Sequence, residues 1–295
     1  NTYTGGTEVQ GGTLTVASNA NLGSGALTLD PTTTVNLTGL ATFTHAIALN
    51  GDPTIEVDSG TTTDVEQISG IGAELIKTGA GTLVLNPSEG SNTYTGGTTI
   101  AGGVLELANA QSAGTGAITF ASGVHTTLQV DGTAIPTNTI DGFTFGDTID
   151  LAGIAYDGSA QPPTLLGNHQ LQFTEHGQSY LISFDPNQQT LSTGTFWLSP
   201  DSSNNGTLVQ LLAPGSVGVT IDSSTLNLAN NTATVTFTFG SAPTAFILAD
   251  LNAVGGALSN LHAVNGFAGL VYAATFTAAA STDINNASVS VIAGS

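Results

Sequence analysis

NTYTGGTEVQGGTLTVASNANLGSGALTLD, the sequence of Asn1–Asp30, returns in altered form at Asn92–Ala121 as NTYTGGTTIAGGVLELANAQSAGTGAITFA. The two stretches are identical at 15 of 30 positions, and their first seven residues are the same. An internal repeat of this length is typical of proteins that are built by stacking similar units. We therefore expect the chain to contain stacked units of similar structure.

Apolar residues in and between the two copies stand two positions apart, as in Leu14/Val16. This is the period of a short strand with both side chains on one face, whereas a helix needs spacings of three and four. Leu14, Val35 and Ile55 also follow one another at intervals of 21 and 20 residues. Further pairs with the same spacing are Leu27/Leu29, Val35/Leu37, Ile47/Leu49, Ile55/Val57, Leu83/Leu85, Leu105/Leu107, Ile118/Phe120 and Leu128/Val130.

A unit of about 20 to 23 residues that carries short strands and polar corners is one coil of a parallel β-helix. Coils stack about 4.8 Å apart, so about six of them form a rod about 30 Å long. Glycine doublets such as Gly11-Gly12 and Gly102-Gly103 supply the positive φ angles that tight corners require. We therefore expect Leu14, Val35 and Ile55 to stack above one another in an inward-facing ladder.

The stretch KTGAGTLVLNPSEGSNTYTGGTTIAGGVLEL at Lys77–Leu107 closely resembles the autotransporter-associated β-strand repeat, found in passenger regions of large secreted proteins of Gram-negative bacteria. The preceding IEVDSGTTTDVEQISGIGAELIKTG at Ile55–Gly79 is similar to that family's preceding coil, and the likeness extends over about residues 1–130. The resemblance implies an extended secreted scaffold and carries no catalytic residues. The loop NPSEGS at Asn86–Ser91 departs from the pattern, and we expect a small protrusion there.

The sequence beyond the repeats remains typical of strands and turns. From about Gly132 the coil spacing fades, while alternation at Leu171/Phe173 and Tyr180/Ile182/Phe184 favours a continuation or cap of the β-helix. After Pro214-Gly215 seven strand candidates follow at close spacing, which favours a two-sheet sandwich. The stretch at Val235–Gly266 is similar to the Ig-like repeats of giant bacterial adhesins, which serve as spacers and are sometimes stiffened by calcium.

The predicted fold class is therefore all-β. It consists of a right-handed parallel β-helix over 1–131, its continuation or cap over 132–213 and an Ig-like β-sandwich over 214–295. In the sandwich, alternating residues of two strands are expected to face inward, namely Val235, Phe237 and Phe239 in one and Tyr272, Ala274 and Phe276 in the other. Tyr272 fits either a tyrosine corner or a partly buried core position.

The charge balance excludes several classes of function. One Lys+Arg residue stands against 21 Asp+Glu, the net charge is −20, and Lys77 is the only fixed cation. Binding to nucleic acid or to an anionic membrane then lacks an electrostatic driving force, and no apolar run is long enough to cross a bilayer. Pectate-type lyases, which neutralise a polyanion, are disfavoured because we expect Lys77 in a corner of the repeat. The absence of cysteine excludes disulfides and thiolate metal sites.

We predict no catalytic residue and no enzyme activity. A hydrolase of neutral glycans needs two carboxylates about 5 to 9.5 Å apart, and Glu56 and Asp58 fit a surface carboxylate ladder better. PGSVG at Pro214–Gly218 lacks the first glycine of a nucleophile elbow, and His169 and His176 fit turns better than a metal site.

Calcium is the cation for which the sequence offers ligands, although no cofactor is required. In DSSNNG at Asp201–Gly206, the oxygen-bearing Asp201, Ser203 and Asn205 occupy the first, third and fifth positions of a calcium loop, with glycine at the sixth. A polar turn is the alternative interpretation, since the glutamate that completes an EF-hand is missing. A second calcium site is expected near the ends of the sandwich strands, from Asp222, Asp250 and Asp283.

These features predict a non-enzymatic structural or adhesive segment that acts as a rigid stalk or scaffold of a secreted or cell-surface protein in a Gram-negative bacterium. The expected partners are neighbouring modules of a larger chain or copies of itself, and surface glycans, with no nucleic acid and no direct membrane insertion. One alternative is a subunit of an extracellular filament or surface layer that assembles head to tail by β-stacking. Another is a glycan-binding or glycan-cleaving β-helix, although Trp197 is the only tryptophan and aromatic residues make up 6%.

Overall fold

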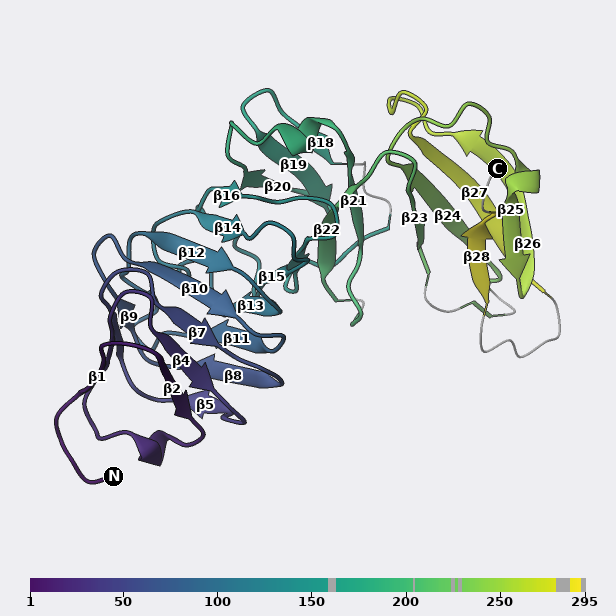
Figure 1. Cartoon of the computed structure of the whole chain (residues 1–295). Coiled ribbons are helices and arrows are strands. Elements are labelled where there is room, and N and C mark those ends of the chain that lie inside the picture. Colours follow the sequence, from purple (N-terminus) through teal and green to yellow (C-terminus); the bar gives the residue numbers. More distant parts are fainter. Residues whose placement is uncertain (159–162, 204, 224–225, 228–229, 280–286, 293–295) are drawn as a thin grey trace.

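Figure 1 shows a computed structural model of the chain, an elongated molecule with a coiled N-terminal part and a separate sandwich at the opposite end. The structure describes residues 1–158, 163–203, 205–223, 226–227, 230–279 and 287–292. No helix in these ranges has the length and hydropathy of a membrane span. Helical structure in the same ranges is confined to short 3-10 turns, which are η1 (Asn19–Asn21), η2 (Gln189–Ser192) and η3 (Leu248–Asp250).

The coils contribute short strands to three parallel sheets, so the all-β parallel solenoid expected from the sequence is confirmed. The first sheet contains β1 (Thr7–Val9), β3 (Leu27–Leu29), β6 (Ile47–Leu49) and β9 (Ile68–Ser69). The second contains β2 (Thr13–Val16), β4 (Thr34–Leu37), β7 (Thr54–Glu56), β10 (Glu74–Thr78), β12 (Gly97–Ile100), β14 (Ile118–Phe120) and β16 (Ile140–Asp141). The third begins with β5 (Thr42–Phe43), β8 (Thr61–Asp64), β11 (Thr82–Leu85), β13 (Val104–Leu107), β15 (Thr127–Val130) and β17 (Thr148–Leu151).

The predicted ladder is present in the second sheet. Leu14 pairs with Val35, and Val35 pairs with Ile55, in successive parallel strands. Val35 and Ile55 are fully buried, because each is covered by the coil above and the coil below. The corner glycines also behave as expected, since Gly12 and Gly103 have φ angles of 76° and 60°.

Lys77 does not lie in a corner, so that expectation is wrong. It is part of β10, pairs in register with Ile55 below and Ile100 above, and is fully buried within the aliphatic ladder. Its Nζ donates to the carbonyl oxygens of Gly79 at 2.8 Å, Gly81 at 2.7 Å, and of Thr78 and Gly102 at 3.0 and 2.8 Å. The ammonium group is thus held by backbone dipoles instead of by an acid. Burial lowers the pKa of Lys77 to about 8.

Asp64 occupies a second polar position in the solenoid interior. It lies in register between Phe43 and Leu85, and it is 1% exposed. One carboxyl oxygen accepts the Glu66 N–H at 3.3 Å, while Oδ2 has no hydrogen-bond partner in the structure. Burial raises the pKa of Asp64 to about 8, and the negative charge of Glu66 adds to the rise. The buried carboxyl is therefore stable in its protonated form near neutral pH.

The repeated NTYTGGT motif joins successive coils. Asn92 accepts the Ile68 N–H of the coil below at 2.8 Å and donates to the Ser112 carbonyl of the coil above at 2.7 Å. The hydroxyl of Tyr94 lies 2.6 Å from that of Thr98, four residues later. The first copy makes the equivalent tyrosine–threonine contact. The second copy of the motif thus links three coils by side-chain hydrogen bonds.

The parallel ladder ends where β22 (Thr207–Leu212) pairs antiparallel with β17. β21 (Thr195–Pro200) extends that sheet, and β18 (Thr164–Leu165), β19 (Gln170–Glu175) and β20 (Gln178–Ser183) form a separate antiparallel sheet. The rings of Phe120, Phe143, Phe184 and Phe196 follow one another with centroid distances of 5.2 to 5.6 Å along the pairs Phe120–Phe143, Phe143–Phe184 and Phe184–Phe196. This buried aromatic cluster covers the end of the aliphatic ladder.

The C-terminal sandwich has one sheet of β23 (Val217–Ile221), β24 (Thr232–Phe239), β27 (Val271–Ala278) and β26 (Gly256–Ala263). The other sheet consists of β25 (Leu251–Val254) and β28 (Ser288–Val291). Val235 and Phe237 face the core as predicted, and both are fully buried. Tyr272 packs edge-on against Phe239 and Phe246, so it is a core tyrosine.

One strand expected in the sandwich is absent from the described residues. The segment AFILADL at Ala245–Leu251 forms a loop and η3, and only its last residue belongs to a strand, as the start of β25, because the Asp250 carboxylate accepts the Ile247 N–H at 2.8 Å and closes a turn. Ile247 is 58% exposed, which is incompatible with an inward strand position. The candidate TLNLA at 225–229 lies partly outside the described residues.

Candidate functional site

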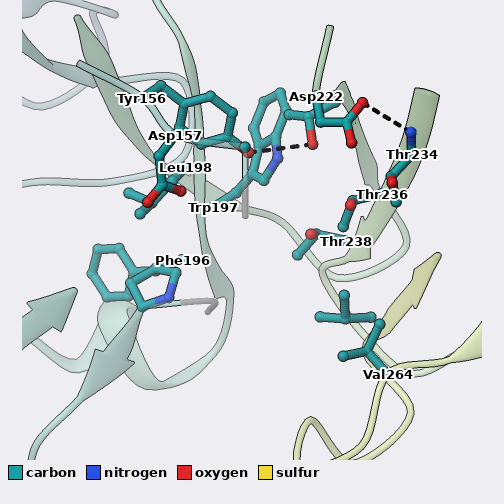
Figure 2. Close-up of a pocket in the computed structure, with 14 residues that line it drawn as sticks. Tyr156, Asp157, Phe196, Trp197, Leu198, Asp222, Thr234, Thr236, Thr238 and Val264 are labelled. Carbon is teal, nitrogen blue, oxygen red and sulfur yellow. Dashed lines mark hydrogen bonds between the residues drawn. The ribbon is translucent and has the colours of Figure 1, made fainter. Parts of the chain in front are cut away.

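A cleft of about 390 Å³ lies between the end of the solenoid and the sandwich (Figure 2). One wall comes from the loop after β17 and from β21, and the other comes from β23 and β24, with single residues from the loop after β26 and from the start of β27. The wall on the solenoid side is formed by Tyr156, Asp157, Gly158, Pro163, Phe196, Trp197 and Leu198. The wall on the sandwich side is formed by Thr220, Asp222, Thr234, Thr236, Thr238, Val264 and Val271.

The two walls are fixed to each other by a close aromatic contact. A Cβ atom at position 218 would lie 2.5 Å from the indole ring of Trp197, so only glycine permits this approach of β23 to β21. The Tyr156 hydroxyl donates to Thr220 Oγ1 at 3.5 Å across the same boundary, and Thr195 donates to the Gly240 carbonyl at 3.2 Å. The cleft therefore has a defined shape rather than being a gap between two unconnected parts.

Three threonines of β24 line the sandwich wall because their side chains alternate with those that enter the core. Thr234 is exposed at the mouth, Thr236 is half-buried, and Thr238 is 4% exposed at the bottom of the row. Figure 2 shows this row facing Trp197 and Tyr156 across the cleft. Hydroxyl groups thus oppose aromatic rings along the length of the site.

The acidic groups near the cleft are held by backbone hydrogen bonds. Asp222 accepts the Thr234 N–H at 2.9 Å, and Asp157 accepts the His176 N–H at 2.8 Å. Behind Asp157, the buried Glu175 accepts the Asp157 N–H at 2.9 Å, and burial raises the pKa of Glu175 to about 7. Burial, together with these carboxylates, also raises the pKa of Tyr156, so its phenol remains a neutral hydrogen-bond donor.

Residues 1–16 and 75–107 match the family described as the passenger-associated-transport-repeat, and residues 202–295 match the bacterial Ig-like domain family. Two parts of the chain are thus similar to two families, the passenger repeat in its N-terminal half and the bacterial Ig-like domain at its C-terminal end. Over 113 residues, 37% of its length, it is 42% identical to the adhesin BmaC autotransporter of Brucella suis biovar 1 (strain 1330), and the match spans 3% of that relative. No solved structure matches the chain.

These matches confirm both resemblances seen in the sequence, and the chain is a secreted or cell-surface protein of a Gram-negative bacterium. The Ig-like match begins at residue 202, before β22, and in the structure β22 pairs with β17, the last parallel strand of the third solenoid sheet. The solenoid sheet and the Ig-like match therefore overlap at β22, and the cleft lies where these two parts of the chain meet.

The predicted calcium ligands make local hydrogen bonds. Ser203 Oγ donates to both Asp201 oxygens, at 3.0 and 2.7 Å, and the Asn205 N–H donates to Asp201 at 3.0 Å. Partial burial opposes the ionisation of Asp201, but these hydrogen bonds outweigh it and lower its pKa. Asp222 and Asp250 each accept a backbone N–H, whereas Asp283 lies outside the described residues. Within the described ranges, no three His, Asp or Glu side chains are placed to share a metal ion.

A cluster of carboxylates that residue type alone does not predict lies on the outer face of the third solenoid sheet. Glu106 and Asp150 stand two strands apart in register, with Gln129 between them. Burial and the neighbouring charge of Asp131 raise the pKa of Glu106 to about 7, and burial together with the charges of Asp201 and Asp131 raises that of Asp150 to about 6. The signal for this group was the coil spacing itself, which aligns residues 106, 129 and 150.

Proposed function

We propose that this chain is a non-enzymatic stalk segment that holds neighbouring modules of a larger surface protein at a distance from the cell. The observation that carries the proposal is the continuous ladder of seven parallel strands in the second sheet, from β2 to β16. Its hydrogen bonds run along the rod axis, so bending or extending the rod requires many of them to break together.

Side-chain contacts support the same role. Asn92 ties three coils together through both ends of its amide, and Lys77 binds carbonyls that belong to two successive coils. The passenger repeats and the likeness to an adhesin autotransporter support a structural or adhesive segment at the bacterial surface. Neighbouring modules of a longer chain are the partners that such a stalk would connect.

The shape of the purified chain tests the proposal. A compact globule of this length has a radius of gyration of about 19 Å. We expect small-angle X-ray scattering to give a clearly larger value, with the asymmetric distance distribution of a rod and with a monomer mass. A compact particle would contradict the stalk role. Regular fibres in electron micrographs would instead favour the filament built by head-to-tail stacking.

Calcium binding is a separate proposal for the Asp201 loop. Ser203 Oγ lies at 3.0 and 2.7 Å from the two carboxyl oxygens of Asp201, and the net charge of −20 favours uptake of a divalent cation. We expect millimolar calcium to raise the melting temperature of the chain, and an Asp201→Asn variant to lose that response. An unchanged melting temperature would contradict calcium binding by this protein.

A further inference from the structure

We propose that the cleft between the passenger solenoid and the Ig-like domain binds an uncharged oligosaccharide. The volume of about 390 Å³ falls in the range of about 300–1,000 Å³ that small-ligand sites occupy. This inference adds a ligand site to the stalk and does not depend on the stalk role being correct.

The solenoid wall supplies the surface that the apolar face of a sugar ring requires. Trp197 and Tyr156 present large, rigid rings, and each also carries a polar atom that can bind a hydroxyl. Trp197 is only half-buried, although its ring is fixed by its contact with Gly218. An aromatic ring held in place before binding loses little conformational freedom when a ligand packs against it.

The sandwich wall supplies hydrogen-bond partners of the matching kind. Threonine hydroxyls both donate and accept, as sugar hydroxyls do, and carboxylates accept only. Thr234, Thr236 and Thr238 form a row of such hydroxyls, with Asp222 at one end. A polyol that lies between the walls can therefore pack one face on the rings while its hydroxyls bind the opposite row.

Charge selects among carbohydrates. The only Lys or Arg in the chain is Lys77, which is buried in the solenoid and engaged by carbonyl oxygens. Asp157 and Asp222 give the cleft a negative potential, so sialylated, uronic or phosphorylated ligands are repelled. The ligand class that satisfies both walls without a counter-charge is the neutral oligosaccharide.

Tryptophan fluorescence of the full chain tests this directly, because Trp197 is the only tryptophan and therefore reports on this cleft. We would titrate the chain with lactose, maltotriose, cellotriose and diacetylchitobiose. The matched anionic probe is 3′-sialyllactose, which adds a carboxylate to lactose. We expect a saturable change in emission with at least one neutral sugar, and a weaker response to 3′-sialyllactose than to lactose if lactose is the sugar that binds.

The Thr236→Val variant removes one hydroxyl from the middle of the cleft and keeps the shape of the side chain. We expect about fivefold to tenfold weaker binding of the responding sugar. The matched control is Thr119→Val on the outer face of the solenoid, which should bind like the unmodified chain. Circular dichroism and the melting temperature establish that both variants are folded.

Four results would overturn the proposal. These are the absence of a saturable change with every neutral sugar, equal binding of the responding sugar by the Thr236→Val variant, binding of 3′-sialyllactose that equals or exceeds the binding of lactose where lactose is the sugar that binds, and a response only to calcium or to a lysine-rich peptide. The scattering experiment on the stalk is independent of all four. A rod that binds no sugar and a compact particle that binds one are therefore distinguishable.

Discussion

Asp64→Asn replaces the buried carboxyl of the solenoid interior by a group of the same shape that cannot ionise. Asp64 is 1% exposed, one of its oxygens has no hydrogen-bond partner, and its pKa is raised from 3.8 to about 8. The folded state therefore holds this proton more tightly than the unfolded state does. The stabilising effect of the protonated carboxyl is complete below about pH 4 and is lost as the pH rises to about 8.

The size of the effect follows from the shift. About four pKa units correspond to about 5 to 6 kcal/mol, at about 1.4 kcal/mol per unit. Near pH 4 we expect the free energies of unfolding of Asp64→Asn and of the unmodified chain to differ by a constant amount. By about pH 8 the variant should gain up to about 5 kcal/mol in free energy of unfolding relative to the unmodified chain. Taking the difference between the two proteins isolates Asp64 from Glu106 and Glu175, whose pKa values are also raised.

Guanidinium unfolding followed by circular dichroism, at several pH values between about 4 and 9, measures this difference. The control is Asp58→Asn, which removes the same charge from an exposed side chain that accepts a hydrogen bond from Asn36 at 3.0 Å. Its stability should follow that of the unmodified chain at every pH. A difference between Asp64→Asn and the unmodified chain that does not change with pH would refute the claim that a neutral carboxyl is buried in the core.

Four further outcomes are expected. Lys77→Met should lower the free energy of unfolding by about 3 kcal/mol in a denaturant titration. Each buried carbonyl that loses its donor costs about 1–3 kcal/mol, and the removal of a buried charge offsets part of this cost. Asn92→Ala should cost about 2 kcal/mol in the same assay, because two buried backbone groups lose their partner. Gly218→Val should shift Trp197 emission to the red by separating β23 from β21, without altering the far-ultraviolet spectrum of the solenoid. Deletion of residues 34–53 should leave a folded, shorter solenoid, because Thr34 and Thr54 are register partners, whereas deletion of 34–43 should prevent folding as judged by circular dichroism.

Much of the solenoid could be predicted from the sequence because its period is carried by buried side chains. Leu14, Val35 and Ile55 follow one another at the coil interval, and the structure pairs them as that interval requires. The alternation at Val235 and Phe237 likewise places both side chains in the sandwich core. In both cases burial on one face determines the register, so the pattern in the sequence is the pattern in the structure.

For the polar residues inside the solenoid, residue type predicts an exposed position, whereas their place in the coil interval predicts the buried position that the structure has. Lys77 stands 22 residues after Ile55 and 23 before Ile100, and Asp64 stands 21 after Phe43 and 21 before Leu85. The spacing therefore contained the signal. A lysine can occupy such a position because glycine carbonyls reach its ammonium group, and that depends on corner geometry that the sequence does not state.

The cleft could not be predicted from the sequence. Trp197 and Thr236 come together only because β21 and β23 approach each other over Gly218, and this contact depends on how two modules pack. The alternation in β24 predicted which residues face outward, but it could not predict what they would face. Sites at module boundaries are generally of this kind, since each wall alone is an ordinary surface.

The burial of Lys77 affects how the folded segment responds to proteases outside the cell. Trypsin-like proteases cut after lysine or arginine. The chain has one such residue, and it is sealed between stacked coils. The folded segment therefore offers these enzymes no side chain to recognise, so it becomes open to them only after the solenoid itself has come apart.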